Sequence, residues 1–368
     1  LYGIYYGRSG RLLSSVFGFL FCVGAFGVQI LAMGAILQTA TGISLIPAAL
    51  IASIVTLAYT WSGGILAVTL TDAVQYVIIV IGVTLCAYLA IDHLGGFDAM
   101  MSILYSNPRF ETNMKPLANW SLVQFLGLFF SFLLGEFCAP YYIQRYASTK
   151  SAKDSKNGLL IFGVHWIFFM VTTAAIGLAS MAIQPDVKPD LAFTNLIRDV
   201  LPIGVTGLVL AALLAAVMSS GAAFINTACV VYTRDIYNKF INPQATQDQM
   251  LRQSRMSTLL VGGVSIGVAI LFQDVFGLMI YIFKLWPSAI IPPLLAGLLW
   301  GKVSPYAGAP AVVIGVVSCF LWSDKVLGEP FGIPANFIGI GMNCLVLFFV
   351  HQKMKGHKPE GPFLPDLN

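Results

Sequence analysis

Two adjacent hydroxyl side chains, Ser219 and Ser220, lie within the apolar stretch from Ala215 to Tyr237. Counted from a span that begins near Pro202, Ser219 is ~17 residues, or roughly 25 Å, along the helix and therefore in its second half. Hydroxyls at such a depth let membrane helices pack closely and share hydrogen bonds. Together with freed backbone carbonyls, they can also coordinate a desolvated cation, as in secondary transporters. The stretch alone leaves both interpretations open.

A carboxylate, Asp72, lies in a second polar cluster near the start of another apolar run. Asp72 and Gln75 share one helical face at positions i and i+3. A carboxylate in lipid is costly and usually faces the bundle interior, where it serves a site. Alternatively, it reaches the interface and caps a helix start, helped by the positive end of the helix. Gly63–Gly64, just before it, predicts a tight turn, because glycine takes positive φ without steric cost.

A third cluster places Glu136 between two helix breakers, Gly135 and Pro140. Proline removes a backbone donor and clashes with the preceding turn. A broken membrane helix is tolerated where it lines a cavity or is buried in protein. Nine residues at ~1.5 Å each separate Glu136 from Arg145, which puts the acid roughly 13 Å from the cytoplasmic edge, near the midplane. At that depth it must be paired, protonated or bound to something.

These residues belong to a polytopic membrane protein. Hydrophobic residues make up 58% of the 368, charged residues only 10%, and the mean hydropathy is +0.83. Uncharged runs long enough to cross a bilayer recur along the chain. Nothing alternates as barrel strands would, so an all-α architecture is expected. Ten spans are predicted: 12–37, 44–62, 66–91, 120–143, 158–183, 202–230, 257–272, 277–300, 306–323 and 332–350.

Basic residues orient these spans. With a cytoplasmic amino end, fourteen fall in cytoplasmic segments and five outside, with Lys284 inside a span, which fits the positive-inside rule. Both ends then face the cytoplasm, and residues 351–368 form a short tail, expected to be disordered. The net charge of +4 therefore reflects topology rather than a nucleic-acid partner. The cytoplasmic set is Arg8, Arg11, Arg145, Lys150, Lys153, Lys156, Arg234, Lys239, Arg252, Arg255, Lys302, Lys353, Lys355 and Lys358, and the outside set is Arg109, Lys115, Lys188, Arg198 and Lys325.

Other chemistry is disfavoured. The six cysteines lie singly in apolar runs, without metal-ligand spacing or a disulfide framework. His165–Trp166 is interpreted as a packing pair, because no Ser, Cys or second His shares its face in a visible motif. No phosphate loop, HExxH or nucleotide fingerprint is present, which disfavours an enzyme, a primary pump or a metalloprotease.

Three sequence motifs of this chain resemble those of a known protein family. The stretches YTWSGGILAVTLTDAVQ, QRYASTKSAKDSKNG and AAVMSSGAAFINTACVVYTRDIY are similar to those of the sodium/solute symporter family, in order and in spacing. The resemblance implies a leucine-transporter-like fold of two inverted repeats of five helices meeting at a midplane site. On that pattern, residues 1–350 correspond to core helices three to ten plus two trailing helices. The resemblance then implies that a leading helix and core helices one and two are absent from this chain, and the start at Leu1 without Met suggests a missing upstream piece.

The resemblance also implies a sodium site. In the family, a carbonyl and two hydroxyls of core helix eight in an A-x-x-S-S pattern bind sodium together with carbonyls of core helix one, and Ala216, Ser219 and Ser220 match that pattern. Uncharged oxygens suit Na⁺, which must be held but also released. Some relatives bind another sodium at an Asp matching Asp72 and at hydroxyls that here are Ala222 and Ala223. One sodium site is therefore expected, with Asp72 left as a second-site or gating residue.

The expected solute contacts are Phe132, Gly135, Glu136 and Lys284. Phe132, Gly135 and Lys284 fall where sugar-carrying members have an Asn, a Tyr and a Gln, so the resemblance makes a sugar less expected. Lys284 lies ~7 residues, or roughly 10 Å, below the outer surface. It either snorkels to that surface or meets a substrate carboxylate. A direct Lys284–Glu136 pair is not favoured, because their estimated depths differ.

The resulting prediction is a plasma-membrane, sodium-coupled symporter that imports a small organic solute, carboxylate-bearing or zwitterionic, by alternating access. Its partners are the solute, sodium and the lipid bilayer. A sugar or polyol symporter, a membrane sensor module and an uncoupled channel on the same fold are the alternatives. The sequence does not reveal the oligomeric state.

Overall fold

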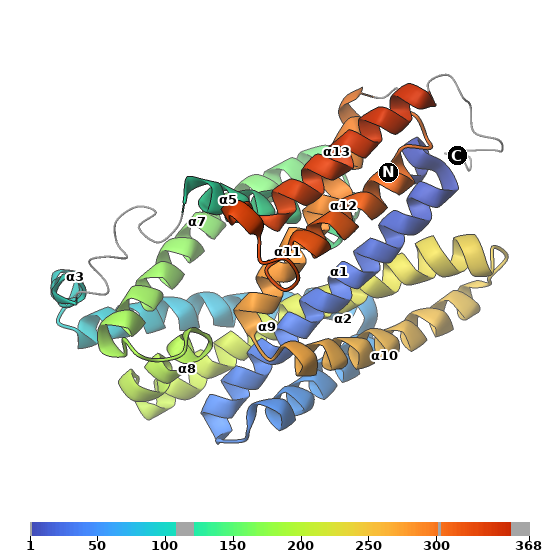
Figure 1. The fold of residues 1–368 in the computed structure, drawn as a ribbon. Helices are drawn as coiled ribbons and strands as arrows, with labels where there is room; N and C mark the ends of the chain where they lie inside the picture. The colour runs from blue at the N-terminus through green and yellow to red at the C-terminus, as the bar shows by residue number, and fades with distance from the viewer. Residues whose placement is uncertain (1, 108–120, 301–302, 355–368) are drawn as a thin grey trace.

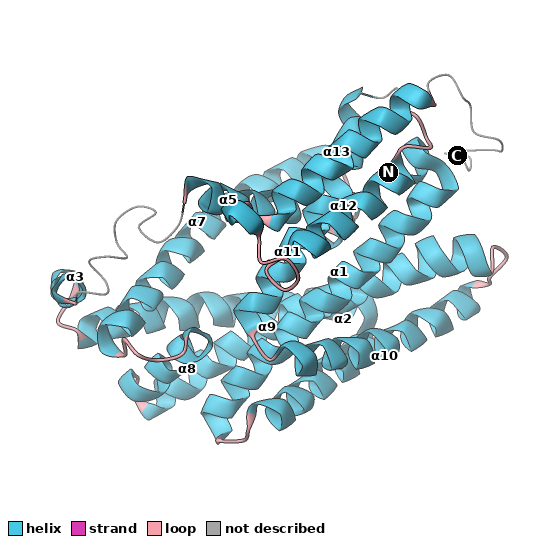
Figure 2. Cartoon of the chain, viewed as in Figure 1, coloured by secondary structure: helices cyan, strands magenta, loops and turns pink. Residues whose placement is uncertain are grey.

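The chain folds entirely into helices. The computed structural model describes residues 2–107, 121–300 and 303–354, apart from the side chains of residues 64–67, 137 and 147, and these residues contain no strand. Within the described chain, nine helices are long and apolar enough to cross a membrane, and the shorter apolar helix Gly308–Trp322 makes a tenth apolar segment. The all-α prediction of about ten spans is thereby confirmed (Figure 2).

The helices follow the predicted order (Figure 1). Their bounds are α1 (Tyr2–Thr41), α2 (Leu45–His93), α3 (Phe97–Ser106), α5 (Leu122–Phe137), α6 (Pro140–Ala147), α7 (Ala152–Ile183), α8 (Pro189–Val200), α9 (Ile203–Val230), the π-helical segment η1 (Val231–Ile241), α10 (Gln247–Phe272), α11 (Val275–Leu295), a π-helical segment η2 (Ala296–Trp300), α12 (Gly308–Trp322), the 3₁₀ turn η3 (Pro330–Gly332) and α13 (Ala335–Lys353).

Helix α1 is the centre of the larger core. It packs against α2, α9, α10 and α11, and it crosses the middle of the molecule in Figure 1. Side chains all along it, such as Cys22, Phe26 and Leu31, are fully buried. Its approach to α2 depends on glycine: a Cβ at Gly34 would lie 2.7 Å from the Cβ of Ala49. Small residues at such crossings bring membrane helices into direct backbone contact.

Helix α2 has two arms, Leu45–Gly63 and Val68–His93, each long enough to be a span. The blue and cyan arms run in different directions in Figure 1. The turn predicted at Gly63–Gly64 adjoins residues 64–67, which lie outside the described side chains. The second arm forms a smaller core with α3, α7, α8 and α9, in which Val83, Ile176, Leu196 and Val209 are buried.

The fourth span is broken, as its Gly135 and Pro140 predicted. Helix α5 ends at Phe137, and α6 begins at Pro140, the first helical position, where the missing N–H of proline is not needed. The break therefore leaves Glu136 in the last turn of α5.

Helix α11 contains three prolines, Pro287, Pro292 and Pro293. The missing N–H groups of Pro292 and Pro293 leave the carbonyls of Ser288 and Ala289 without their i+4 donors. The side-chain amide of Asn343, on α13, donates to both carbonyls, at 2.7 and 3.1 Å. Helix α13 thus satisfies the carbonyls that the prolines of α11 release.

Helix α13 extends to Lys353, three residues past the end predicted for the last span. His351, which the sequence places at the start of the tail, is 5% exposed, and its Nδ1 accepts a hydrogen bond from the Ser304 amide at 3.1 Å. The start of α1 and the end of α13 lie at the same end of the molecule (Figure 1), as the topology requires. Five of the orienting basic residues and the rest of the tail lie outside the described residues: Arg109, Lys115, Lys302, Lys355 and Lys358, with residues 355–368.

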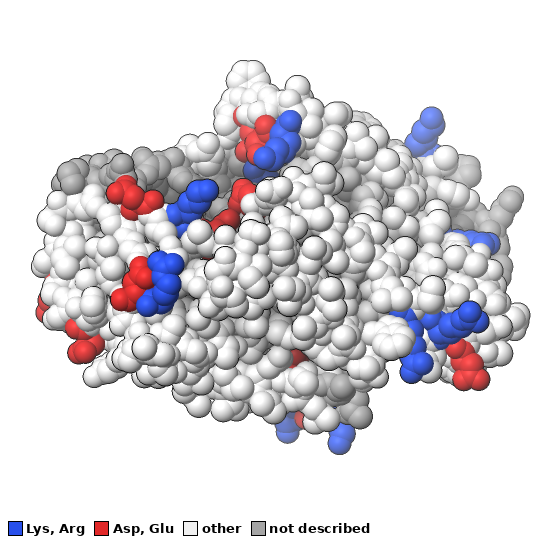
Figure 3. Space-filling model, turned by 90° about the horizontal axis from the view of Figure 1, so that it is seen from below, with Lys and Arg blue, Asp and Glu red and all other residues white. Residues whose placement is uncertain are grey.

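Charged side chains are sparse on the surface of the described chain. In the view of Figure 3, Lys, Arg, Asp and Glu gather toward the margins and leave a broad uncharged face. Helix α7 illustrates this composition, because only 6% of its most apolar window is buried inside the protein. Such a surface is expected to face lipid.

Candidate functional site

One cavity of about 820 Å³ collects residues from all three polar clusters of the sequence. Asp72 comes from the second arm of α2, Glu136 from α5, and the serine pair from α9. The sequence-predicted residues that line it are Asp72, Phe132, Glu136, Ala216, Ser219 and Ser220. Gly135 and Lys284 are not among its lining residues. We refer to this space as the central cavity.

The serine pair forms an oxygen cluster within one turn of α9. Both hydroxyls donate to the carbonyl of Ala216, from Ser219 at 2.9 Å and from Ser220 at 3.1 Å. Their positions at i+3 and i+4 put both within reach of that carbonyl. Tyr59 donates to the neighbouring carbonyl of Met218 at 3.0 Å. This bond joins the motif that begins at Tyr59 to the motif that contains the serine pair. Three uncharged oxygens therefore lie together on the cavity wall.

Asp72 faces the cavity and forms an ion pair there. Arg145 Nη2, from α6, lies 3.1 Å from Asp72 Oδ2. The other carboxylate oxygen, Oδ1, is buried and has no hydrogen-bond partner among the described residues. On the α9 side, Ala223 lines the cavity and Ala222 is fully buried. Because both are alanines, neither supplies a side-chain oxygen. A guanidinium, rather than hydroxyl groups, meets this carboxylate.

Glu136 accepts a hydrogen bond from the hydroxyl of Tyr141, one turn beyond the helix break. No Lys, Arg or His nitrogen of the described chain lies within 4.0 Å of its carboxylate. Phe132, one turn earlier on α5, packs against Phe283 of α11 with ring centroids 5.1 Å apart. Gly135 makes this packing possible, because a Cβ there would lie 2.8 Å from a ring carbon of Phe283.

Lys284 lies apart from the other predicted solute contacts. Its Nζ is 2.5 Å from Glu329 Oε1, and the two side chains are only 14% and 19% exposed. Glu329 belongs to the segment between α12 and α13, and the same oxygen accepts from the amide of Ala335 at the start of α13. The structure thus joins Lys284 to the trailing helices and does not bring it to Glu136, in line with the depths estimated from the sequence.

Residues 4–315 match the model of the Sodium:solute symporter family. The chain belongs to the sodium:solute symporter family. This is a family of membrane transporters and not of enzymes.

Named relatives agree with the family. The chain is 26% identical to the osmoregulated proline transporter of Bacillus subtilis, over 75% of this chain and 56% of the relative. It is 26% identical to the sodium/glucose cotransporter of Vibrio parahaemolyticus, over 82% of this chain and 60% of the relative. The chain thus spans less than two thirds of the length of these two relatives.

The structure of a Na⁺-coupled sialic acid symporter in a substrate-bound, outward-open state superimposes with a TM-score of 0.77 at 19% identity. The alignment covers 94% of this chain and 74% of the other. This likeness confirms the leucine-transporter-like fold predicted from the motifs.

The sequence motifs of this symporter-family chain did not reveal one wall of the central cavity. Tyr76 and His165 line it, with the Tyr76 hydroxyl 3.1 Å from His165 Nδ1, and Trp166 lines it as well. The His165–Trp166 pair is therefore part of the cavity wall, as well as a packing unit. The available signal was the position of Tyr76, four residues after Asp72 on the same helical face.

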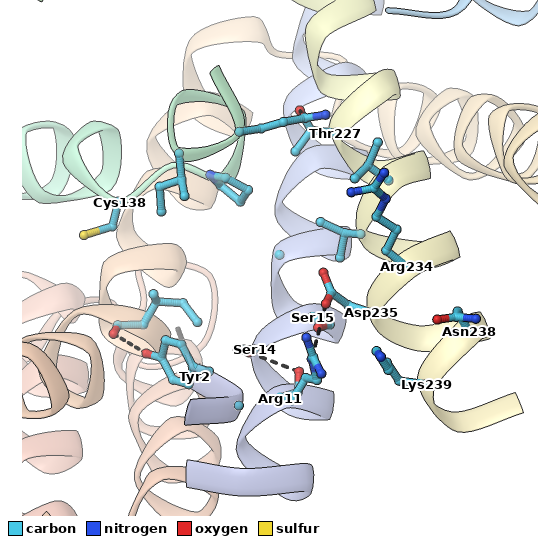
Figure 4. Close-up of a pocket in the computed structure, with 18 of the residues that line it drawn as sticks. Tyr2, Arg11, Ser14, Ser15, Cys138, Thr227, Arg234, Asp235, Asn238 and Lys239 are labelled. Atoms are coloured by element: carbon cyan, nitrogen blue, oxygen red, sulfur yellow. Dashed lines mark hydrogen bonds and ion pairs between the residues drawn. The ribbon is translucent and has the colours of Figure 1, made fainter. Parts of the chain in front are cut away.

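A second cavity, of about 730 Å³, lies between α1, η1 and α11 of the symporter-family chain (Figure 4). Arg11 of α1 faces Asp235 of η1 across it, with Nε 3.3 Å from Oδ1. The Thr227 hydroxyl donates to Gln144 Oε1 at 2.9 Å, and both residues line this cavity and the central one. This contact therefore lies between the two spaces.

Proposed function

We propose that this chain acts in the sodium-coupled import of a small organic solute across the plasma membrane by alternating access, with both of its ends in the cytoplasm. Carboxylate-bearing or zwitterionic solutes are favoured over sugars. The family, the relatives and the fold support the class of transporter. The cation and the solute are argued from the central cavity.

The observation that carries the proposal is the oxygen cluster of α9. The Ala216 carbonyl and the Ser219 and Ser220 hydroxyls lie on the wall of the same cavity as Glu136. Neutral oxygens at this spacing suit a monovalent cation that must be released again. We therefore assign sodium to Ala216, Ser219 and Ser220.

A single cation is favoured at this face of α9. Asp72 is the residue that would serve a second sodium site, and its carboxylate is already paired with Arg145. Ala222 and Ala223 offer no side-chain oxygens. In this proposal Asp72 organises α2 and α6 through Arg145 instead of binding sodium.

The solute side of the proposal rests on Phe132 and Glu136. Proline transporters and glucose cotransporters are both among the relatives, so similarity alone does not choose between them. A sugar requires hydrogen-bonding groups around several hydroxyls. Here Phe132 and Gly135 pack against Phe283, which leaves an apolar surface next to one carboxylate. A sugar or polyol symporter is therefore the second candidate.

Lys284 does not take part in our assignment of the solute contacts. In one interpretation of the sequence, its ammonium group meets a substrate carboxylate. To do so, it would have to leave Glu329, at the cost of leaving a mostly buried carboxylate without its partner. Any solute carboxylate is expected to meet groups that line the central cavity.

The test is a thermal-shift screen of the full-length protein against amino acids, small acids, amines and sugars, each with and without Na⁺. A ligand that binds the folded state raises the melting temperature by mass action. We expect sodium-dependent stabilisation by a small acid or zwitterion, followed by sodium-dependent uptake in proteoliposomes. Stabilisation by a sugar would select the second candidate. Uptake that does not depend on the sodium gradient would favour an uncoupled channel. Ligand binding without any uptake would favour a sensor.

A further inference from the structure

The carboxylate of Glu136 is unusual among the acids that line the two cavities or lie close to them. Asp72 is paired with Arg145, Asp235 with Arg11, and Glu329 with Lys284. Glu136 has a phenolic hydroxyl as its partner and, among the described residues, no basic side chain. A charge at membrane depth without a counter-charge is costly and marks a functional site by default. A positively charged group of a bound solute would supply the counter-charge that the described residues do not.

Aromatic rings surround the same part of the cavity. The aromatic wall comprises Phe132, Tyr141, Tyr142, Phe224 and Phe283, all of which line the central cavity. Tyr141 lies 4.4 Å from Tyr142 and 5.0 Å from Phe224 between ring centroids, and Phe132 lies 5.1 Å from Phe283. Four different helices, α5, α6, α9 and α11, supply these rings. The hydrogen bond from Tyr141 joins the carboxylate to this group of rings, and all of them line the same cavity.

Two cations could meet this arrangement, a metal ion or an organic ammonium group. A small metal ion needs several oxygens to replace its hydration shell, and the rings of Phe132, Phe224 and Phe283 offer only carbon. An ammonium group gains both from the carboxylate and from the negative faces of aromatic rings. The carboxylate of Glu136 and the aromatic wall therefore favour an organic ammonium group over a metal ion.

We propose that Glu136 and the aromatic wall bind the ammonium group of the solute. This inference rests on the function proposed above and narrows it, because it selects amines and zwitterions and excludes acids that carry only a carboxylate. A primary or secondary ammonium would donate a hydrogen bond to Glu136. A quaternary ammonium, which has no N–H to donate, would depend on the charge of Glu136 and on the rings.

The probes are tetramethylammonium, glycine betaine, acetate and glucose, titrated against the purified full-length protein at constant ionic strength, with melting temperature as the readout. Tetramethylammonium and glycine betaine should stabilise the protein, and acetate and glucose should not. In Glu136→Gln, the tetramethylammonium concentration for half-maximal effect should rise roughly tenfold or more, since one charge–charge contact is lost. Asp98→Asn, which removes an exposed carboxylate from α3, should leave the titration unchanged.

Further variants keep the test valid if Glu136→Gln does not fold. Tyr141→Phe keeps the ring and the charge of Glu136, and should shift the titration less than Phe224→Leu, which removes a ring. Equal stabilisation by acetate or glucose, or a tetramethylammonium titration that none of these variants changes, would overturn the inference.

The outcomes also separate this inference from the proposed function. Sodium-dependent uptake of a solute that ammonium compounds do not compete for would leave the symporter proposal standing and remove the ammonium site. Glu136-dependent binding of tetramethylammonium, with uptake that ignores sodium, would keep the ammonium site and remove the coupling.

Discussion

The side-chain amide of Asn343 lies 2.7 Å from the backbone carbonyl of Ser288, on a different helix. That carbonyl has no helical donor because Pro292 occupies the position of its i+4 partner. Asn343 is fully buried, and its amide also reaches the carbonyl of Ala289. The trailing helix α13 therefore stabilises the form of α11, which carries Phe283 to the central cavity.

Replacing Asn343 by Leu should lower stability markedly. Two buried carbonyls would lose their donor, and each unsatisfied buried group costs about 1–3 kcal/mol. We expect a clear fall in the melting temperature of the detergent-solubilised protein. Met342→Leu, the neighbouring residue on α13 and 38% exposed, is the matched control and should change little. An Asn343→Leu protein as stable as the wild type would show that these contacts do not hold α11.

Replacing Ser219 and Ser220 together by Ala should abolish the sodium dependence of uptake. The change removes two of the three oxygens of the cluster while keeping the helix, because alanine is the best helix former. The measurement is uptake into proteoliposomes across a range of sodium concentrations. Ser131→Ala is the control: its hydroxyl also bonds back to a carbonyl of its own helix, α5, but it does not line the central cavity. An unchanged sodium response in the double variant would remove the assignment of sodium to α9.

The Asp72–Arg145 pair should show coupling in a double-mutant cycle. Arg145→Gln leaves Asp72 without its cation, and Asp72→Asn leaves the guanidinium without its acid. Because the Arg145 side chain is 55% exposed and screened by water, we expect a coupling energy of only about 1 kcal/mol in thermal unfolding. The apparent sodium affinity of Arg145→Gln should also change, since the freed carboxylate can attract a cation. Additive effects on stability would argue against a functional pair.

The Lys284–Glu329 pair should matter more for stability than Asp72–Arg145. Both side chains are mostly buried, so removing one partner strands a charge, which costs up to about 3–5 kcal/mol in a fully buried pair. Lys284→Met and Glu329→Gln should each lower the melting temperature, and the double variant should recover part of the loss. Added salt should have little effect on this pair, because buried charges are weakly screened. If Lys284→Met instead weakened solute binding without loss of stability, Lys284 would return as a solute contact.

Hydropathy was sufficient to predict the spans, because a bilayer demands long uncharged helices whatever their neighbours. The residues at which the helices begin and end were less predictable. Helix α7 begins at Ala152, six residues before its predicted start at 158, because the polar turns that extend it beyond lipid carry no hydropathy signal. The helix break next to Glu136 was predictable, since proline acts locally.

The contacts between distant residues were not predictable in the same way. Glu329 and Lys284 are 45 residues apart in the sequence, and Glu329 has a left-handed backbone, with φ 49°, that no local motif predicts. The Tyr76–His165 contact requires α2 and α7 to lie together, which neither motif specifies. The motifs located the polar residues, and the packing of the helices decides which of them share a cavity.

The close approach of Phe283 to Gly135 limits which residues can stand at either position. Any side chain at position 135 would collide with the ring of Phe283 and displace it from the cavity surface. A larger residue at position 135 is therefore compatible with the fold only if the ring at position 283, almost 150 residues away in the sequence, shifts or is replaced. The shape of this part of the cavity surface thus depends on two positions on two helices, and no single local motif contains both.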